Sequence, residues 1–161
     1  MKALGGGDLV LEPQVAAHAR ALFAVLHQPG VYDFLDDEPP VSLEDWTERL
    51  TQLESRRSPD GSEHWLNWVI VHRGEVLGFV QATVSGDAAM IAYVLGSAHW
   101  GKGLASAASA LMLDELKASY GVRIVSATVH ARNDRSVRLL QGLGFEEWPL
   151  RTSALLFEKT L

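Results

Sequence analysis

The alternation of apolar and polar residues along the chain predicts a mixed α/β protein. β-strand spacing or β-rich composition occurs in residues 9–12, 65–72, 76–84, 90–95, 123–129 and 154–159, and in a short run around Phe145. Apolar residues recur at helical spacing in residues 15–26, 43–53, 103–120 and 134–143. The predicted order of elements is therefore β-α-α-β-β-β-α-β-α-β-β.

Turn and cap residues delimit these elements. Pro29-Gly30 ends the first helix, and an acidic and aromatic loop, 31–40, follows it. Ser42 with Asp45 resembles a capping box at the start of the second helix. Short turns at 73–75 and 85–87 join three successive strands. We therefore expect three antiparallel strands that lead into a glycine-rich stretch.

Length, composition and charge restrict the class of protein. With 161 residues, of which 47% are hydrophobic and 21% charged, the chain fits one globular domain, 1–161. It contains no cysteine, its first residues lack the apolar core of a signal peptide, and no apolar run is long enough to span a bilayer. We expect a soluble, cytoplasmic protein without membrane contacts. The net charge of −6 argues against nucleic-acid binding and favours cationic partners such as amines.

The most informative segment, 93–106, is an apolar strand that leads through a glycine-rich turn into an alanine-rich helix. Such a turn directs main-chain N–H groups and the positive end of a helix dipole at one point, which favours a phosphate or pyrophosphate. The spacing from Gly96 to Gly101-Lys102 also satisfies most of a Walker A loop. However, Gly103 has no side-chain oxygen for magnesium, and the later strand ends in His130 where a carboxylate is needed. A P-loop nucleotide hydrolase is therefore only the third alternative.

The glycine turn resembles the acetyl-coenzyme A signature of the GNAT N-acetyltransferases. Gly103 and Ala105 fall on its small positions, and Trp100 replaces its Gln or Arg, as in the RimJ/RimL-like subgroup. A second segment, 129–146, resembles the family's later strand, its Asn-x-x-Ser helix and its Leu-Gly-Phe ending, and residues 9–13 resemble the subgroup's first strand. The resemblance covers nearly the whole chain. It implies the GNAT fold, a mostly antiparallel mixed sheet that splays apart between its fourth and fifth strands.

The resemblance also implies acetyl-coenzyme A (acetyl-CoA) as cofactor. In the family, its pantetheine arm pairs with the splayed end of the fourth strand and its pyrophosphate lies on the glycine turn. The cofactor-binding residues implied here are Val94, Leu95, Gly96, Trp100, Gly101, Lys102, Gly103, Leu104, Ala105, Ser106, Asn133 and Arg138. Because the net charge is negative, a local basic patch must hold the phosphates. The basic residues near the two motifs, which a solvated helix face explains equally well, are Lys102, Arg132, Arg135 and Arg138.

Acetyl transfer to an amine is aminolysis of a thioester, which needs positioning, an oxyanion donor and release of a thiolate. A strand N–H at Val94 or Leu95 is the expected oxyanion donor. Many family members protonate the thiolate with a helix tyrosine, but that position holds Leu140 here. Ser136, one turn after Asn133, is the expected substitute, and Asn133 is expected to contact the cofactor. Both residues are also typical of an ordinary helix start.

The general base and the metal chemistry are less defined. Candidates for the base, acting directly or through a water, are Glu63, His64, His72, Asp87 and Tyr93. No histidine pair has metal-ligand spacing at a helical interval, so no metal is expected.

The acceptor amine is expected on the other side of the splayed strands, under the first two helices. The expected substrate-binding residues are Tyr32, Phe34, Asp36, Asp37 and Tyr93, among which the carboxylates would attract a cationic amine. A solvated connector is the alternative interpretation of this loop. The acceptor, a small molecule or a peptide, stays open. A cofactor-binding or sensing protein without catalysis is the alternative function, and homodimers are common in the family.

Overall fold

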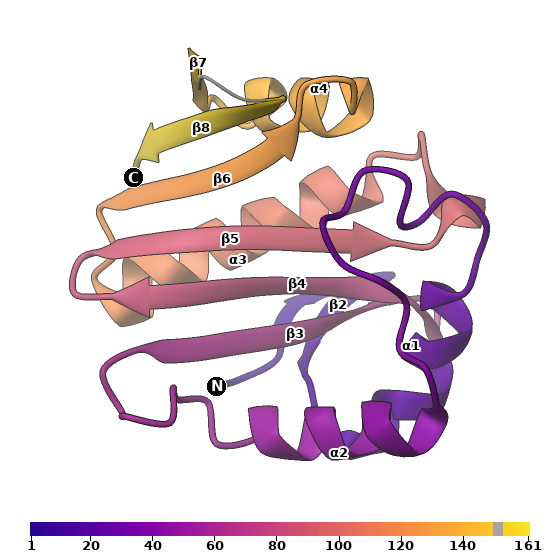
Figure 1. The fold of residues 1–161 in the computed structure, drawn as a ribbon. Coiled ribbons are helices and arrows are strands. Elements are labelled where there is room, and N and C mark those ends of the chain that lie inside the picture. The colour runs from indigo at the N-terminus through magenta and orange to yellow at the C-terminus, as the bar shows by residue number, and fades with distance from the viewer. Residues whose placement is uncertain (150–152) are drawn as a thin grey trace.

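An eight-stranded sheet forms the centre of the protein in a computed structural model that describes residues 1–149 and 153–161. Its strand order is β1-β2-β3-β4-β5-β6-β8-β7. The strands are Leu4–Gly6 (β1), Leu9–Pro13 (β2), His64–His72 (β3), Glu75–Ser85 (β4), Ala88–Leu95 (β5), Ile124–His130 (β6), Glu146–Pro149 (β7) and Ala154–Thr160 (β8). Neighbouring strands are antiparallel except for β5 and β6, which are parallel (Figure 1).

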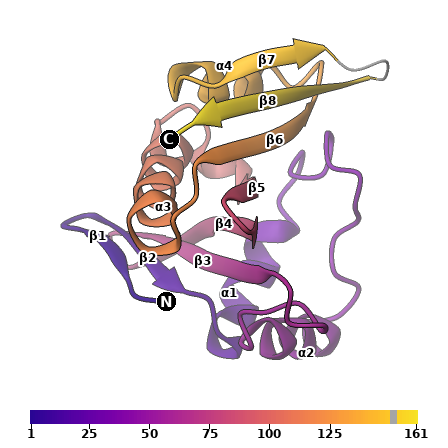
Figure 2. The same cartoon turned by 90° about the vertical axis from the view of Figure 1, so that its left-hand side faces the viewer.

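Helices cover both faces of the sheet. Within the described part of the chain the α-helices are Ala19–Leu26 (α1), Leu43–Leu53 (α2), Leu104–Tyr120 (α3) and Asp134–Gly142 (α4). Two short 3₁₀ helices, Ala16–His18 and Ser97–His99, precede α1 and α3. Figure 2 shows α1 and α2 on one face and α3 on the other. The mixed α/β class is confirmed, and the predicted order of elements is observed with one additional strand, β1, at its start.

Two apolar cores hold these layers together. The smaller core joins α1 and α2 to β3 through Leu22, Leu50 and Val69. The larger core lies under α3, where Met112 and Leu116 are fully buried. Alternating residues of the central strands supply the two cores from opposite faces of the sheet, as the period of two in a strand requires.

Local signals explain where the helices begin and end. Ser42 Oγ accepts a hydrogen bond from the Asp45 N–H at 3.1 Å, which confirms the predicted cap of α2. Gly103 and Gly121 flank α3, and both adopt left-handed φ angles, 73° and 65°, that glycine tolerates best. The sequence therefore determines the ends of these helices locally.

One strand, β1, is missing from the sequence prediction, which instead allows disorder in the first residues. Two of its three residues are glycines, so it shows no apolar alternation. Tertiary contacts form it. Leu4 pairs with Leu11 of β2, the Trp68 indole donates to the Lys2 carbonyl at 3.1 Å, and the Lys2 ammonium lies 3.1 Å from the Glu115 carboxylate.

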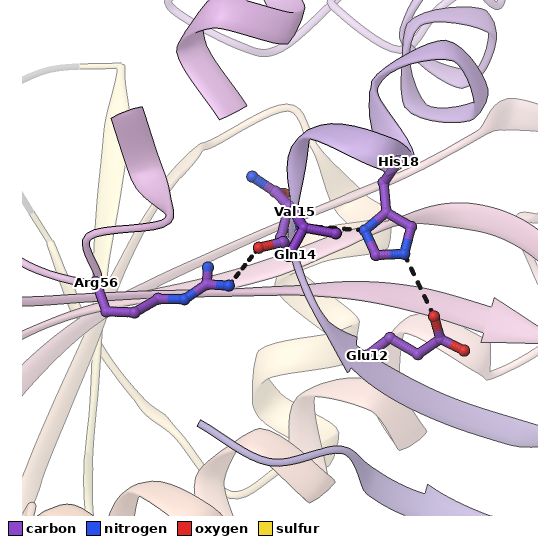
Figure 3. Close-up of polar contacts among 5 residues, drawn as sticks. All are labelled: Glu12, Gln14, Val15, His18 and Arg56. Atoms are coloured by element: carbon purple, nitrogen blue, oxygen red, sulfur yellow. Dashed lines mark hydrogen bonds and ion pairs between the residues drawn. The ribbon is translucent and has the colours of Figure 1, made fainter. Parts of the chain in front are cut away.

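A polar network holds the link between β2 and α1 (Figure 3). The Val15 N–H donates to His18 Nδ1 at 3.1 Å, and His18 Nε2 lies 3.3 Å from the Glu12 carboxylate. An accepting Nδ1 requires the ring proton on Nε2, facing Glu12. The Arg56 guanidinium donates to the Gln14 carbonyl. These contacts anchor the start of the α1–α2 layer to the sheet, and that layer carries the loop that reaches the site.

Candidate active site

β5 and β6 pair over a short distance and then separate. Their register joins residues 88–90 to residues 124–126, whereas β5 continues to Leu95 and β6 to His130. The widening gap between the two strands is visible in Figure 1. The predicted splay is thus confirmed. A cavity of about 400 Å³, called here the gap cavity, lies at this open end.

Most predicted site residues line the gap cavity. They are Phe34, Tyr93, Val94, Leu95, Trp100, Gly101, Gly103, Leu104, Ala105, Ser106, Asn133, Ser136 and Arg138. Gly96 and Lys102 lie outside its lining. Gly96 faces Gln28, and the Lys102 ammonium donates to the Ala98 carbonyl at 3.0 Å.

The main chain at the end of β5 has a fixed orientation. Gly78 of β4 lies so close that a Cβ on it would stand 2.0 Å from the Val94 carbonyl oxygen, so this oxygen points toward β4. The peptide between Val94 and Leu95 is trans and planar. The Leu95 N–H therefore points the opposite way, into the gap.

Trp100 connects three parts of the site. Its indole Nε1 donates to the Leu95 carbonyl oxygen at 2.8 Å. The Arg135 guanidinium carbon lies 3.6 Å from the centroid of its ring, a stacked cation–π contact. A Cβ on Gly30 would lie 3.3 Å from the edge of the same ring. The indole therefore bridges β5, α4 and the loop after α1.

The glycine turn and the start of α3 have the geometry of an anion site. Gly101 and Gly103 adopt left-handed φ angles of 74° and 73°. No side chain caps α3 at Gly103, so the first N–H groups of this 17-residue helix remain available to a ligand. Arg135 and Arg138 of α4 line the same cavity. Backbone donors and guanidinium groups together suit the phosphates of a coenzyme.

On the α4 side, Asn133 both caps the helix and lines the cavity. Its Oδ1 accepts from the Ser136 N–H at 3.3 Å. The Tyr93 phenol donates to the Ser136 carbonyl at 3.4 Å, and burial raises the pKa of Tyr93 to about 12. A phenol that stays protonated at neutral pH can donate a proton but does not act as a base. Leu140, at the position of the usual tyrosine, is fully buried in the larger core.

A second cavity of about 810 Å³, called here the acidic cavity, lies across β5 under α1 and α2. Predicted residues Tyr32, Asp36 and Asp37 line it, whereas Phe34 and Tyr93, also predicted for the acceptor, line the gap cavity instead. Its other acidic residues are Glu38, Asp45 and Glu63, and its other aromatic residues are Trp46, Trp65 and Phe79. Burial, together with the charge of Asp37, raises the pKa of Tyr32.

The two cavities meet at the end of β5, because Val94 and Leu35 line both. The loop after α1 reaches across this point. Its Phe34 packs on His130 at the end of β6, with ring centroids 5.5 Å apart and an interplanar angle of 34°. The loop therefore contacts both arms of the splay.

The structure separates the five candidates for the general base. Glu63 and Tyr93 line cavities, and the phenol of Tyr93 is neutral. His64 packs edge-on against Tyr120, His72 pairs with Leu9 at the far end of β3, and Asp87 bonds Arg123 at 2.9 Å. Among the described residues, no group of three His, Asp or Glu side chains is placed to hold a metal ion.

Of the four basic residues expected near the two motifs, Arg135 and Arg138 line the gap cavity, and their i, i+3 spacing places both on one face of α4. His99, which also lines the cavity, is missing from the sequence prediction. His99 lies 3.6 Å from the Glu75 carboxylate and its side chain is only 15% exposed. No spacing in the sequence indicates His99.

Comparison with known proteins defines the class. Residues 8–146 match the model of the acetyltransferase (GNAT) domain. The chain belongs to the GNAT acetyltransferase family, and it is an acetyl-CoA-dependent N-acetyltransferase, as the sequence predicts. The gap cavity, with its glycine turn and two arginines, fits that cofactor.

Individual relatives are distant in sequence but similar in fold. The uncharacterized N-acetyltransferase p20 of Bacillus licheniformis is 26% identical over 150 residues, which cover 91% of this chain and 84% of that protein. RimL, the ribosomal L7/L12 α-N-protein acetyltransferase in complex with coenzyme A, superposes with a TM-score of 0.83 at 16% identity, covering 97% of this chain and 96% of RimL. The ribosomal-protein-S5-alanine acetyltransferase from Vibrio fischeri superposes with a TM-score of 0.82 at 18% identity, covering 98% of this chain and 96% of that protein. The resemblance to the RimJ/RimL-like fold is confirmed.

No helix in the described ranges, 1–149 and 153–161, is long and apolar enough to cross a membrane.

Proposed function

We propose that the gap cavity binds acetyl-CoA, that the acidic cavity binds the acceptor amine, and that acetyl transfer takes place at the end of β5. The observation that carries this proposal is the meeting of the two cavities at Val94 and Leu35. A thioester held beside Val94 from one side is then open to attack from the other. Reacting groups brought together in this way lose the entropic cost of a bimolecular encounter.

Residues 93–95 would hold the pantetheine arm of the cofactor, and residues 101–106 would hold its pyrophosphate. The free N–H groups at the start of α3 donate to the pyrophosphate. Arg135 and Arg138 supply positive charge from the facing wall. This charge is local, in a chain whose net charge is −6.

The chain's own groups then assist each stage of the aminolysis. As the neutral amine forms its bond to the thioester carbon, the Leu95 N–H donates to the oxygen that gains negative charge. When the carbon–sulfur bond breaks, the Ser136 hydroxyl donates a hydrogen bond to the departing thiolate and keeps its own proton. The proton lost by the amine passes to water, with Glu63 as the carboxylate placed in the acidic cavity to receive it.

The acidic cavity selects a cationic acceptor. It has five carboxylates, Asp36, Asp37, Glu38, Asp45 and Glu63, and one guanidinium, Arg49. None of these five forms an ion pair within residues 1–149 and 153–161. Their uncompensated charge raises the local concentration of ammonium groups.

RimL and the S5-alanine enzyme modify ribosomal proteins, and we extend that acceptor class, a protein amine, to this chain. A small cationic amine is the second candidate, which the acidity of the cavity favours. A cytoplasmic location, a homodimer and the absence of nucleic-acid and membrane contacts stay predictions.

Thermal unfolding with acetyl-CoA, free coenzyme A and magnesium-ATP tests the cofactor site, because a ligand of the folded state raises the midpoint. We expect a shift with both coenzymes and none with magnesium-ATP. Thiol release with a panel of basic peptides and small amines then tests turnover. Binding without turnover on every acceptor would favour the cofactor-binding alternative, and no binding would refute the site.

A further inference from the structure

We propose that Trp100 is a positioning residue for acetyl transfer, which fixes the end of β5 so that the Leu95 N–H faces the thioester oxygen. The inference rests on the proposed function, in which that N–H is the oxyanion donor. It gives Trp100 a role toward the end of β5 that differs from the expected contact with the cofactor.

The peptide between Leu95 and Gly96 is held at both of its polar atoms. On one side, the Trp100 indole donates to the Leu95 carbonyl at 2.8 Å. On the other side, the Gly96 N–H donates to the Leu77 carbonyl, also at 2.8 Å. Leu77 is fully buried in the larger core, so its carbonyl belongs to a closely packed part of β4. The peptide plane cannot rotate without breaking two hydrogen bonds.

The preceding peptide is held by close packing. The Val94 carbonyl lies against Gly78, where a Cβ would stand only 2.0 Å away. The peptides on both sides of Leu95 are therefore fixed, one by Gly78 and the other by Trp100. An oxyanion donor is effective when its direction is set before the reaction, because no free energy is then needed to reorient it.

The indole is itself held in place. Arg135 stacks on its face at 3.6 Å, and the absence of a side chain on Gly30 makes room for its edge. The indole N–H can only donate a hydrogen bond, and the Leu95 carbonyl is its acceptor. Because Arg135 precedes Ser136 on α4, Trp100 also links the oxyanion donor on β5 to the hydroxyl proposed to donate a hydrogen bond to the thiolate.

Trp100→Phe keeps an aromatic ring beside Arg135 and removes the N–H. We expect kcat to fall about tenfold, the scale of one net hydrogen bond. The KM for acetyl-CoA should stay within about twofold, because the phosphate contacts remain. The matched control is Trp148→Phe, on the edge strand β7, where the side chain is 52% exposed and no change is expected.

Amide hydrogen exchange of the unliganded protein gives a readout that does not need turnover. Exchange of the Gly96 N–H, which is bonded to the Leu77 carbonyl, should be about tenfold faster in Trp100→Phe than in the wild type, and unchanged in Trp148→Phe. If Trp100→Phe does not fold, the wild type alone decides, because the Trp100 indole N–H should exchange at least about tenfold more slowly than that of Trp148.

An unchanged kcat, or a higher KM for acetyl-CoA at unchanged kcat, would overturn the inference. So would unchanged exchange of the Gly96 N–H. If the wild type acetylates no amine, the proposed function fails, and the exchange rates still decide whether Trp100 holds the end of β5.

Discussion

The Tyr93 phenol of β5 donates a hydrogen bond to the main-chain carbonyl of Ser136 in α4, across 3.4 Å. This bond crosses the gap beyond the point where β5 and β6 stop pairing at residues 90 and 126. Beyond the last main-chain pair, the two arms of the splay are therefore connected through a side chain. The bond also fixes the first turn of α4, which carries Ser136, relative to β5.

The alkaline stability of the protein should depend on Tyr93. Burial raises its pKa to about 12 in the folded chain, above the ordinary value of 10.0 that applies after unfolding. Between these pH values the folded chain binds more protons, so the free energy of unfolding falls as pH rises from about 10 to about 12. Below pH 10 the contribution is fully present. Chemical denaturation of the wild type and Tyr93→Phe across this range measures it, and equal slopes in both proteins would contradict the assignment.

Ser136→Ala should lower kcat by about ten- to a hundredfold, the range expected for loss of a hydrogen bond to the charged thiolate. The affinity for coenzyme A should not change, because the Asn133 cap acts on the Ser136 N–H and not on its hydroxyl. Ser119→Ala, on the exposed end of α3, is the matched control. Thiol-release kinetics and calorimetric binding separate the two effects. An unaffected kcat would remove Ser136 from the mechanism.

Charge reversal in the acidic cavity should weaken acceptor binding only. Asp36→Lys or Asp37→Lys should raise the acceptor KM several-fold, and the effect should shrink with added salt, as screening of exposed charges requires. Asp114→Lys, on the exposed face of α3, makes the same change in net charge away from both cavities. Steady-state kinetics at two salt concentrations measures the difference. Equal kinetics in the cavity variants and the control would support a solvated connector.

Gly78→Ala should destabilise the fold and weaken cofactor binding together, because its Cβ would overlap the Val94 carbonyl at 2.0 Å. Overpacking of this kind costs about 2 kcal/mol or more. Gly6→Ala is the control, since a Cβ there meets nothing within 4 Å and its φ is not positive. Thermal unfolding with and without coenzyme A measures both effects. A Gly78→Ala protein as stable as the control would refute the close approach of β4 and β5.

Arg138→Gln should reduce the affinity for coenzyme A about tenfold, the scale of one charge-assisted contact with a phosphate. Arg132→Gln provides a control in the same segment, because Arg132 does not line the gap cavity. Calorimetry at low and high salt should show the difference between the two variants becoming smaller as salt rises. Identical affinities would place the phosphates away from α4.

The sequence predicts most of the fold because its signals are local. The periodic apolar residues define the strands and helices, and Ser42 and Gly121 mark helix ends. β1 has no such signal, since it exists only through its pairing with β2 and the contacts of Lys2. A strand that forms through tertiary contacts alone shows no alternation of apolar and polar residues in the sequence.

The sequence also predicts much of the site. The glycine turn and the Asn133–Ser136 spacing locate the residues around the gap cavity, because the motif and the helical turn each fix their own geometry. The division between the cavities is not visible in the sequence. Phe34 turns toward His130 while its neighbour Asp36 faces the acidic cavity, and the bond from Trp100 to Leu95 depends on a 3₁₀ turn between them.

The short pairing of β5 with β6 leaves the two halves of the sheet joined by few main-chain hydrogen bonds. These halves share a ladder of three residue pairs, and the angle between them beyond that ladder is set by side chains such as Phe34 with His130 and Tyr93 with α4. Substitution of these side chains would therefore change the opening between the two strands without breaking the main-chain ladder.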